Sequence, residues 1–480
     1  MKLDQLLEGV TLTERAVPGD VQITSVSYDT RTLAPGALFV ALTGYKTDGH
    51  KFIRTALEKG AAAVLCQTPP EEDGPWLVCP ESRAALATVS ANWFGHPGRE
   101  MQLLAVTGTN GKTTTTNLLK QVLERCAGAK VGLIGTNRNM IGAESFPAER
   151  TTPESYDLQC LLRQMADAGC THVVMEVSSH ALALHRVDTL RFAAGVFTNL
   201  TEDHLDFHGS MEAYRDAKGK LFAQSDVAVL NLDDGAGRYF HSSVPGAQFT
   251  YSENKDAADL TAKNIRLFPD RVEFEAVTLR GIHRVRLPIP GGFSIYNALS
   301  VIACTQALGL PLDCVCEALA HVKGVKGRVE VVETPAPYTV LIDYAHTPDA
   351  LEKILTTVRD LAAGRVICLF GCGGDRDRSK RPIMGTLAAE LADLVVVTSD
   401  NPRTEPPESI IADILKGMKG TQTAYVVEPD RRRAIRIALS QGQPGDVVLL
   451  AGKGHETYQE INGVKLHLDE KEEIEDFFAN

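Results

Sequence analysis

Leu103–Glu124, in the first half of the 480-residue chain, reads LLAVTGTNGKTTTTNLLKQVLE. An apolar run is followed by a Gly-rich turn and then by apolar residues at helical spacing, Leu118, Leu119, Val122 and Leu123. The pattern predicts a strand, a loop and a helix in that order. Further apolar runs at THVVMEV, AAGVFTN and VAVLN alternate with helical stretches and favour a doubly wound, mostly parallel sheet.

The turn inside this stretch, TGTNGKT from Thr107 to Thr113, has the features of a phosphate-binding loop. Glycines let the backbone approach an anion closely, amide groups at a helix N-terminus face it, and Lys112 neutralises its charge. The hydroxyl of Thr113 is placed to bind Mg²⁺. Val106 stands where the full motif has its first Gly, so the loop is shortened by one position. The order strand, loop and helix still indicates ATP binding rather than a chance Gly- and Thr-rich turn.

Length and composition narrow the class of protein. A chain of 480 residues predicts about three domains. The formal net charge of −12 argues against a nucleic-acid-binding protein, because phosphate backbones are bound by clustered Lys and Arg. Asp4 and Glu8 fall where a signal peptide needs apolar residues, and no apolar run approaches the ~18 residues of a membrane helix. We therefore expect a cytoplasmic protein without a membrane span, whose ten Cys residues are reduced and structural.

Three blocks of sequence predict an α/β protein of three domains. Residues 1–97 are expected to form a small N-terminal domain that ends in a helix over Ala84–Trp93. Residues 98–330 form the central ATP-binding domain, with antiparallel strands expected over 260–290. Residues 331–480 form a Rossmann-like C-terminal domain, with strands expected at TVLIDYA, RVICLFG, DLVVVTS, AYVVE and DVVLLAG.

Further motifs follow one another along essentially the whole chain. They are MEVSSHAL, TNLTEDHLDFHGS, YRDAK, GGFSIYN, GRVE, DYAHTPDAL, GCGGDRDRSKRP, SDNPRTEPP and AGKGHE. Together with GTNGKT they resemble the Mur ligase family, whose members join an amino acid or peptide to a UDP-N-acetylmuramoyl peptide. The first motifs are shared with folylpolyglutamate synthetases. DNPR, with GDRD and KGHE, is similar to the members that add the third peptide residue, in their meso-2,6-diaminopimelate-using form.

The resemblance implies an ATP-dependent acid–amino-acid ligase that forms ADP and phosphate. A substrate carboxylate attacks the γ-phosphate of ATP, and the amine of the incoming amino acid then attacks the acyl phosphate. The implied partners are ATP, UDP-N-acetylmuramoyl-L-alanyl-D-glutamate bound partly by the N-terminal domain, and meso-diaminopimelate, with Mg²⁺ as cofactor. The implied role is cytoplasmic peptidoglycan precursor synthesis, and hence cell-wall biogenesis, cell shape and cell division, by a monomer.

Negative charge crowds at the first step, so cations and positioned donors are needed. The resemblance implies that Glu176 and His204 join Thr113 as magnesium ligands, although by residue type alone a surface Glu and a capping His fit equally well. Lys218 corresponds to the family's carbamylated lysine, N6-carboxylysine, which binds a second Mg²⁺; a solvated helix lysine is the ordinary alternative. Lys112, Glu176, His204 and Lys218 are thus the expected catalytic residues.

The resemblance also implies three sets of binding residues. The ATP set is Gly108, Thr109, Asn110, Gly111, Lys112, Thr113, Thr114, Asn297, Arg328 and Asp343. The UDP-sugar-peptide set is Thr30, Thr151, Thr152, Ser178 and Arg186. The diaminopimelate set is Arg376, Asp400, Asn401, Arg403, Gly452 and Glu456. In this last set the arginines and Asn401 are expected to bind carboxylates, and Gly452 with Glu456 the distal end of the substrate.

Other functions fit parts of the pattern. The nearest is the same ligase using L-lysine, against which Arg403 argues, because a buried Arg left unpaired is costly. A folylpolyglutamate synthetase does not account for the DNPR and KGHE motifs. A nucleotide-binding regulator without catalysis is expected to lack Lys112, Glu176 or His204, and all three are present. A simple P-loop ATPase has no need of a third domain with its own arginine pocket.

Overall fold

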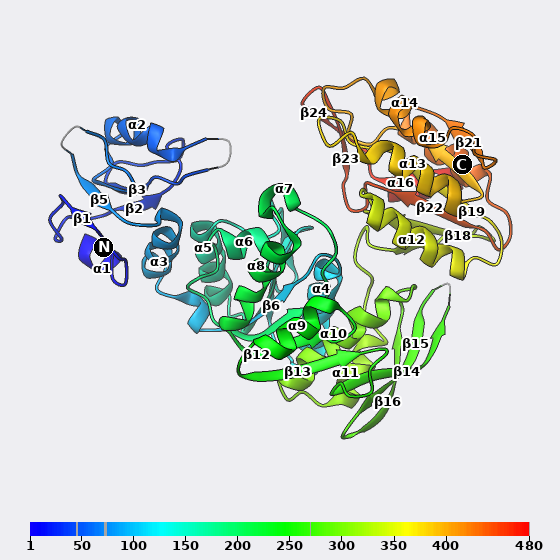
Figure 1. Cartoon of the computed structure of the whole chain (residues 1–480), viewed down its shortest axis with the longest axis horizontal. Coiled ribbons are helices and arrows are strands. Elements are labelled where there is room, and N and C mark those ends of the chain that lie inside the picture. The colour runs from blue at the N-terminus through cyan, green and yellow to red at the C-terminus, as the bar shows by residue number, and fades with distance from the viewer. Residues whose placement is uncertain (45–46, 72–73, 269, 480) are drawn as a thin grey trace. The chain divides into compact units, whose positions relative to one another are not determined.

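The computed structural model describes residues 1–44, 47–71, 74–268 and 270–479 (Figure 1). The chain divides into two compact units, which are described separately. The first is Met1–Thr261 with Leu299–Val315, and the second is Ala262–Ala298 with Cys316–Asn480. Over the described ranges, no helix is long and apolar enough to cross a membrane.

The N-terminal part of the first unit is a five-stranded sheet with the order β1-β5-β4-β3-β2. Strands β2 to β5 are parallel, and β1 pairs antiparallel with β5. Side chains alternate along a strand, so Leu38 and Phe39 enter two different apolar cores, one on each face. The last helix, α3, confirms the helix predicted there. The elements are α1 (Leu3–Leu6), β1 (Glu14–Arg15), β2 (Ser25–Ser27), β3 (Ala37–Val40), η1 (Gly49–Phe52), α2 (Ile53–Glu58), β4 (Ala63–Cys66), β5 (Trp76–Val78), α3 (Ser82–Trp93) and η2 (Pro97–Arg99).

The centre of the first unit is a parallel sheet with the order β13-β12-β11-β6-β10-β7, extended by the antiparallel β8 and β9. Because β6 lies between β11 and β10, the loop that follows it opens in the middle of the carboxyl edge of the sheet. The elements are β6 (Gln102–Thr107), α4 (Lys112–Ala127), β7 (Val131–Ile134), β8 (Asn139–Ile141), β9 (Glu144–Phe146), α5 (Ser155–Asp167), β10 (His172–Glu176), α6 (Ser179–Ala183), β11 (Phe192–Phe197), α7 (Leu205–His208), α8 (Met211–Ala223), β12 (Ser225–Asn231), α9 (Gly235–Ser243) and β13 (Ala247–Ser252).

The strands over 260–290 were expected to be antiparallel. The prediction is confirmed for β15 (Val272–Thr278) and β16 (Gly281–Leu287), which pair antiparallel. It is wrong for β14 (Leu260–Leu267) where that strand meets β13, because the two run parallel there. Helices α10 (Phe293–Ala307) and α11 (Leu312–Leu319) follow.

The C-terminal part of the second unit confirms the predicted Rossmann-like domain. Its sheet has the order β17-β18-β22-β19-β20-β21, parallel except for β17. Buried apolar residues pack on both faces, and β22 is in the middle of the sheet. The elements are β17 (Glu330–Val332), β18 (Thr339–Asp343), α12 (Pro348–Leu361), β19 (Val366–Phe370), α13 (Lys380–Leu391), β20 (Leu394–Val397), α14 (Pro407–Gly417), β21 (Ala424–Val427), α15 (Arg431–Ser440), β22 (Val447–Ala451), β23 (Tyr458–Ile461), β24 (Val464–His467) and α16 (Glu470–Ala479).

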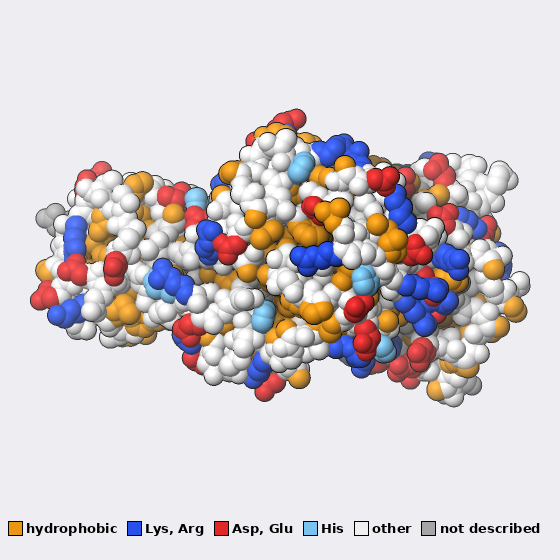
Figure 2. Space-filling view, turned by 90° about the horizontal axis from the view of Figure 1, so that it is seen from below, with side chains coloured by type: hydrophobic (Ala, Val, Ile, Leu, Met, Phe, Trp, Pro, Cys, Tyr) orange, Lys and Arg blue, Asp and Glu red, His pale blue; other side chains and the backbone are white. Residues whose placement is uncertain are grey.

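The surface carries charges of both signs. Figure 2 shows Lys and Arg side chains interspersed with Asp and Glu over the visible face. This mixture accords with a chain that has 49 basic and 61 acidic residues.

A disulfide joins two distant segments of the first unit. Cys126, in the last turn of α4, is bonded to Cys314 in α11, with their Cα atoms 5.8 Å apart. The expectation of ten reduced cysteines is therefore wrong for this pair, because a separation of 188 residues gives no sign of contact in the sequence. The other eight cysteines form no disulfide with one another in the part of the chain that the structure describes.

We expect Cys126→Ser to lower the Tm of the oxidised protein by roughly 5 °C, because the disulfide restricts the unfolded chain. Differential scanning fluorimetry with and without dithiothreitol measures the effect, which is expected to vanish in the reduced protein. Cys160→Ser is the matched control, since Cys160 is also half-buried but free. An equal loss of Tm under reducing conditions would contradict the role of the cross-link.

Candidate active site

The predicted phosphate loop lies between the end of β6 and the start of α4 and contains Gly108 to Thr113, with Thr114 in the first turn of the helix. Gly108 has φ 148°, and a Cβ added there would lie 1.9 Å from Thr198 Oγ1. Glycine is therefore required at this position by both the backbone conformation and the close approach of Thr198, the residue that follows β11. Asn199, which the sequence analysis missed, accepts a hydrogen bond from the Asn110 amide (2.9 Å) and so holds the loop.

Two lysine ammonium groups converge on this loop. Lys112 Nζ and Lys218 Nζ each donate to the carbonyl oxygen of Gly108, both at 2.9 Å. Lys218 is 1% exposed, in α8. Burial, together with the Lys112 cation, holds the pKa of Lys218 well below its usual range. The alternative of a solvated helix lysine is therefore wrong, and the catalytic role of Lys218 stays a prediction.

Glu176 ends β10, beside Val106 of β6, and is 1% exposed. Its carboxylate accepts hydrogen bonds from Thr113 Oγ1 (3.1 Å), Thr136 N (2.9 Å) and Thr136 Oγ1 (3.0 Å). The surface alternative for Glu176 is therefore wrong. Thr136 was missed by the sequence analysis, although its position just after β7 at the same carboxyl edge is a signal for it.

His204 has a left-handed conformation with φ 54° at the start of α7. Its ring lies 4.8 Å from that of His180 and 6.1 Å from that of Tyr214, whose hydroxyl lies 3.2 Å from Thr109 Oγ1 in the loop. Burial lowers the pKa of His204, which favours the neutral imidazole that binds metals.

A hydroxyl, a carboxylate and a neutral imidazole suit Mg²⁺ chemically. In the part of the chain that the structure describes, no three His, Cys, Asp or Glu side chains gather into a metal site.

The predicted UDP-sugar-peptide residues of the central sheet lie beside Glu176. Thr152 Oγ1 donates to the Glu176 backbone carbonyl (2.9 Å), and its own carbonyl accepts from Arg186 Nη1 (3.0 Å). Ser178 N donates to Thr152 Oγ1 (3.1 Å), and the Thr151 and Thr136 hydroxyls are 3.0 Å apart. These four predicted residues form one connected network.

Two arginines that the sequence analysis missed, Arg83 and Arg150, join the predicted Arg186 beside this network. Arg83, Arg150 and Arg186 all approach the buried carboxylate of Glu154, at 3.1, 3.6 and 3.3 Å. Three arginine cations surround one carboxylate, so this group of four side chains has a net positive formal charge beside the predicted substrate-binding residues. Thr30 is apart from them, in the loop after β2, where its carbonyl accepts from Lys59 Nζ (2.7 Å).

The predicted diaminopimelate residues are in the second unit. Arg403, with φ 51°, donates from Nη1 to the Gly374 carbonyl (2.8 Å), and its Nε is 3.4 Å from a carboxylate oxygen of Glu460. The residue is half-buried rather than buried as expected, and it is paired with Glu460. Arg376 is exposed. Both arginine side chains lie close to Gly373, because a Cβ atom added to Gly373 would be 3.0 Å from Arg403 Nη1 and 3.8 Å from Arg376 Cγ.

The remaining members of this set surround a lysine that the sequence analysis did not select. Lys453 Nζ donates to Glu456 Oε2 (2.8 Å) and Asn401 Oδ1 (3.1 Å), and lies 3.5 Å from Asp400 Oδ1. Gly452, which precedes it, has φ 112°.

The other predicted ATP residues lie after β16. Asn297 is buried in α10, one turn before Ser300, whose hydroxyl is 3.2 Å from that of Thr115 in α4. Asp343 is buried and accepts from the Val329 and Ala345 amides, both at 2.8 Å. Burial raises the pKa of Asp343, while the neighbouring Arg328 opposes that shift. The Arg328 guanidinium lies 4.8 Å from the Tyr344 ring centroid.

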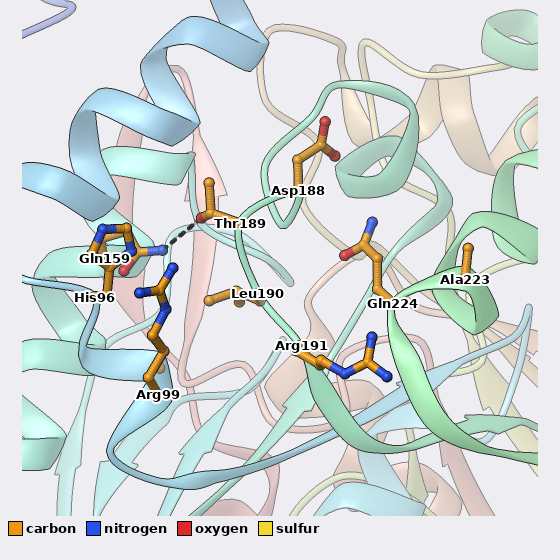
Figure 3. A pocket seen from close by; sticks show the side chains of 10 residues that line it. His96, Arg99, Gln159, Asp188, Thr189, Leu190, Arg191, Ala223 and Gln224 are labelled. Carbon is orange, nitrogen blue, oxygen red and sulfur yellow. Dashed lines mark hydrogen bonds between the residues drawn. The ribbon is translucent and has the colours of Figure 1, made fainter. Parts of the chain in front are cut away.

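A cavity of about 450 Å³ lies beside the residues that precede β6, β11 and β12, whereas the phosphate loop follows the carboxyl end of β6 (Figure 3). Its lining comes from η2, α5, the residues just before β11 and the end of α8. Gln159 Nε2 donates to Thr189 Oγ1 (3.0 Å) at its wall, near Arg99 and Arg191. None of the predicted site residues lines it, so the cavity is separate from the candidate active site.

Comparisons with known proteins cover the whole chain. Three family models match: Mur ligase family, catalytic domain, over residues 22–91; Mur ligase middle domain over 106–305; and Mur ligase, glutamate ligase domain, over 327–454. The UDP-N-acetylmuramoyl-L-alanyl-D-glutamate–2,6-diaminopimelate ligase of Caldanaerobacter subterraneus is 47% identical, covering 100% of this chain and 99% of that protein. The ligase of the same name from Clostridioides difficile is 43% identical, covering 98% of each.

A solved structure of a protein with the same name as these relatives has a similar fold. A structure titled as a UDP-N-acetylmuramoyl-L-alanyl-D-glutamate–2,6-diaminopimelate ligase matches with a TM-score of 0.74 and 32% identity, covering 100% of this chain and 99% of that one. The fold is shared with a MurF ligase of Thermotoga maritima in complex with ADP, at a TM-score of 0.62 and 20% identity, covering 95% of this chain and 96% of that one.

The three-domain α/β architecture and the phosphate loop, with these matches, define an ATP-dependent ligase. Within that class of enzymes, the chain belongs to the Mur ligase family.

Proposed function

We propose that this ligase joins meso-2,6-diaminopimelate to UDP-N-acetylmuramoyl-L-alanyl-D-glutamate, with ATP converted to ADP and phosphate. The observation that carries the proposal is the full-length similarity, at 47% identity, to a relative named for this reaction. The pocket of the second unit supports it, because Arg403 suits a carboxylate and Glu456 an ammonium group. The reaction belongs to cytoplasmic peptidoglycan precursor synthesis, and through it to cell-wall biogenesis, cell shape and cell division.

The substrates are divided among the parts of the chain in this proposal. Residues 1–97 contribute the uridine contacts, with Thr30 among them; residues 98–330 bind ATP; and residues 331–480 bind the amino acid. Thr151, Thr152, Ser178 and Arg186 hold the muramoyl peptide beside the loop. The protein acts as a monomer.

The first step forms an acyl phosphate. A carboxylate oxygen of the acceptor's D-glutamate attacks the γ-phosphorus, the bond to the bridging oxygen breaks, and ADP leaves. Lys112 and the loop amides neutralise the charge that accumulates. Arg186 with the neighbouring arginines counters the approaching carboxylate. In the second step an amine of diaminopimelate attacks the acyl carbon, phosphate leaves with the bonding pair, and the nitrogen loses a proton.

Mg²⁺ fits Thr113, Glu176 and His204, and when bound it supplies charge neutralisation on the phosphates. Glu176 is kept in place for this role by Thr136, whose amide and hydroxyl both donate to it. The hydroxyl of Thr113 already points at that carboxylate.

Lys218 is carbamylated in this proposal and provides the ligand for a second Mg²⁺. The neutral amine attacks carbon dioxide and loses a proton, which leaves a carbamate with one negative charge. Burial and the Lys112 cation lower the pKa of Lys218, so more of the neutral amine is present than for a solvated lysine. The carbamate also removes the repulsion between two ammonium groups at one carbonyl oxygen.

The test is phosphate release from ATP by the purified protein with Mg²⁺ and UDP-N-acetylmuramoyl-L-alanyl-D-glutamate. We expect turnover with meso-diaminopimelate and at most about one-hundredth of it with L-lysine, because lysine lacks the second carboxylate. Comparable turnover with lysine would support the ligase activity but contradict the assignment of diaminopimelate as the amino-acid substrate. If the protein turns over neither diaminopimelate nor lysine but does turn over a folate with glutamate, the proposed function is wrong and the protein is a folylpolyglutamate synthetase.

A further inference from the structure

Lys453, the lysine of the AGKGHE motif, is a buried cation in the amino-acid pocket. It follows β22, the central strand of its sheet, and its side chain is 0% exposed. An ammonium group in such a place is destabilising unless it is paired and hydrogen-bonded. Its partners therefore show what it is built to hold.

All three partners of Lys453 belong to the predicted diaminopimelate set. Glu456 Oε2 and Asn401 Oδ1 accept from its Nζ, and Asp400 Oδ1 is 3.5 Å away. Asn401 Nδ2 also donates to Glu456 Oε2 (2.9 Å). Lys453 thus fixes the orientation of both the amide and the carboxylate.

The network extends to the arginine side of the pocket. Asn401 Oδ1 accepts from the Glu460 amide (2.9 Å), and the Glu460 carbonyl accepts from the Arg403 amide (3.0 Å). Glu460 Oε2 also lies 3.4 Å from Arg403 Nε. The position of Lys453 is therefore coupled to Arg403 through one strand, β23.

Formal charge gives Lys453 a second effect. Asp400 and Glu456 carry two negative charges and Lys453 one positive charge, so the cluster has a net charge of −1. That charge complements a substrate end carrying one ammonium group. Without the lysine, two carboxylates would face each other with a charge of −2, and like charges at short range repel.

We propose that Lys453 is a positioning residue for the amino-acid substrate, orienting Asn401 and Glu456 and setting the charge of the subsite that receives the ammonium group. The inference rests on the proposed function and deepens it. It predicts an effect on amino-acid affinity rather than on ATP binding or on the chemical step.

The test is steady-state kinetics of Lys453→Met, which keeps the length of the side chain and removes its charge. We expect the KM for meso-diaminopimelate to rise roughly 30-fold, the loss typical of one charged hydrogen-bonding group, with kcat and the KM for ATP nearly unchanged. Lys465→Met is the matched control, because Lys465 is exposed and its ammonium group, like that of Lys453, lies near the Tyr458 ring, at 4.2 Å and 5.5 Å from the centroid respectively. Lys453→Arg is expected to recover part of the affinity.

A purely structural lysine gives a different result. The amount of folded enzyme and kcat would then fall together while the KM for diaminopimelate stayed at the wild-type value, which would overturn the proposal. If Lys453→Met does not fold, Lys453→Gln, which keeps a hydrogen-bond donor at this position without the charge, tests the same KM. A wild-type enzyme inactive with diaminopimelate refutes the proposed function, whereas an active wild type with an unchanged KM in the variants refutes only the role of Lys453.

Discussion

Lys218→Ala is expected to lower ligase turnover by about 10³-fold, the loss found when a group that stabilises transition-state charge is removed. The side chain is buried at the phosphate loop, where its Nζ shares the Gly108 carbonyl with Lys112. Phosphate release measures the loss. Because a carbamate is a carboxylate-like group, added acetate or formate is expected to restore part of the activity in the space left by the side chain.

The carbamate has its own signature and its own control. Protein equilibrated with ¹³C-labelled carbon dioxide is expected to give one carbamate carbon resonance that is absent from Lys218→Ala. Lys220→Ala, two residues along α8 and exposed, is expected to keep both the resonance and the activity. A resonance that survives in Lys218→Ala, or no rescue by any small carboxylate, would mean that Lys218 acts as an unmodified amine.

Arg403→Ala is the second large effect that we expect. Loss of its carboxylate contact should reduce kcat/KM for meso-diaminopimelate by about 10²-fold, corresponding to roughly 3 kcal/mol. A larger loss is not expected, because Arg403 is half-buried and already shares its charge with Glu460. Kinetics with varied diaminopimelate at saturating ATP separate this effect from a loss of nucleotide binding.

The preference of Arg403→Ala for diaminopimelate over L-lysine shows whether Arg403 contacts the substrate or whether the substitution damages the enzyme in general. In Arg403→Ala the preference for diaminopimelate over L-lysine should shrink, since the group that senses the second carboxylate is gone. Arg433→Ala, exposed on α15 of the same unit, should change neither rate nor preference. If kcat/KM falls equally for diaminopimelate and lysine in this variant, Arg403 has a structural role and does not contact the substrate.

Much of the architecture could be predicted from local sequence. The run after Lys112 forms a helix with Leu118, Leu119, Val122 and Leu123 all buried, as its spacing indicated. Continuous apolar runs became the parallel strands of both sheets, because strands covered on both faces have no polar alternation. Glu176 was located correctly because it ends such a run, and the carboxyl edge of a parallel sheet is where ligands bind.

What could not be predicted depends on contacts between distant segments. Thr136 reaches Glu176 across 40 residues, and Arg83 reaches Glu154 across 71. Lys453 looked like an ordinary lysine because only the fold shows that it is buried among Asp400, Asn401 and Glu456. The parallel pairing of β13 with β14 was also not predicted. Whether two strands run parallel or antiparallel depends on the path of the chain between them rather than on residue type.

The bond between Cys126 and Cys314 makes part of the backbone a closed ring. A single cut inside that ring opens it without separating the chain into two molecules. Leu279, 99% exposed at the turn between β15 and β16, is a natural place for such a cut. The two pieces of a nicked oxidised enzyme would then migrate as one species until a reductant is added, and the phosphate loop would stay covalently attached to the segment carrying Arg403.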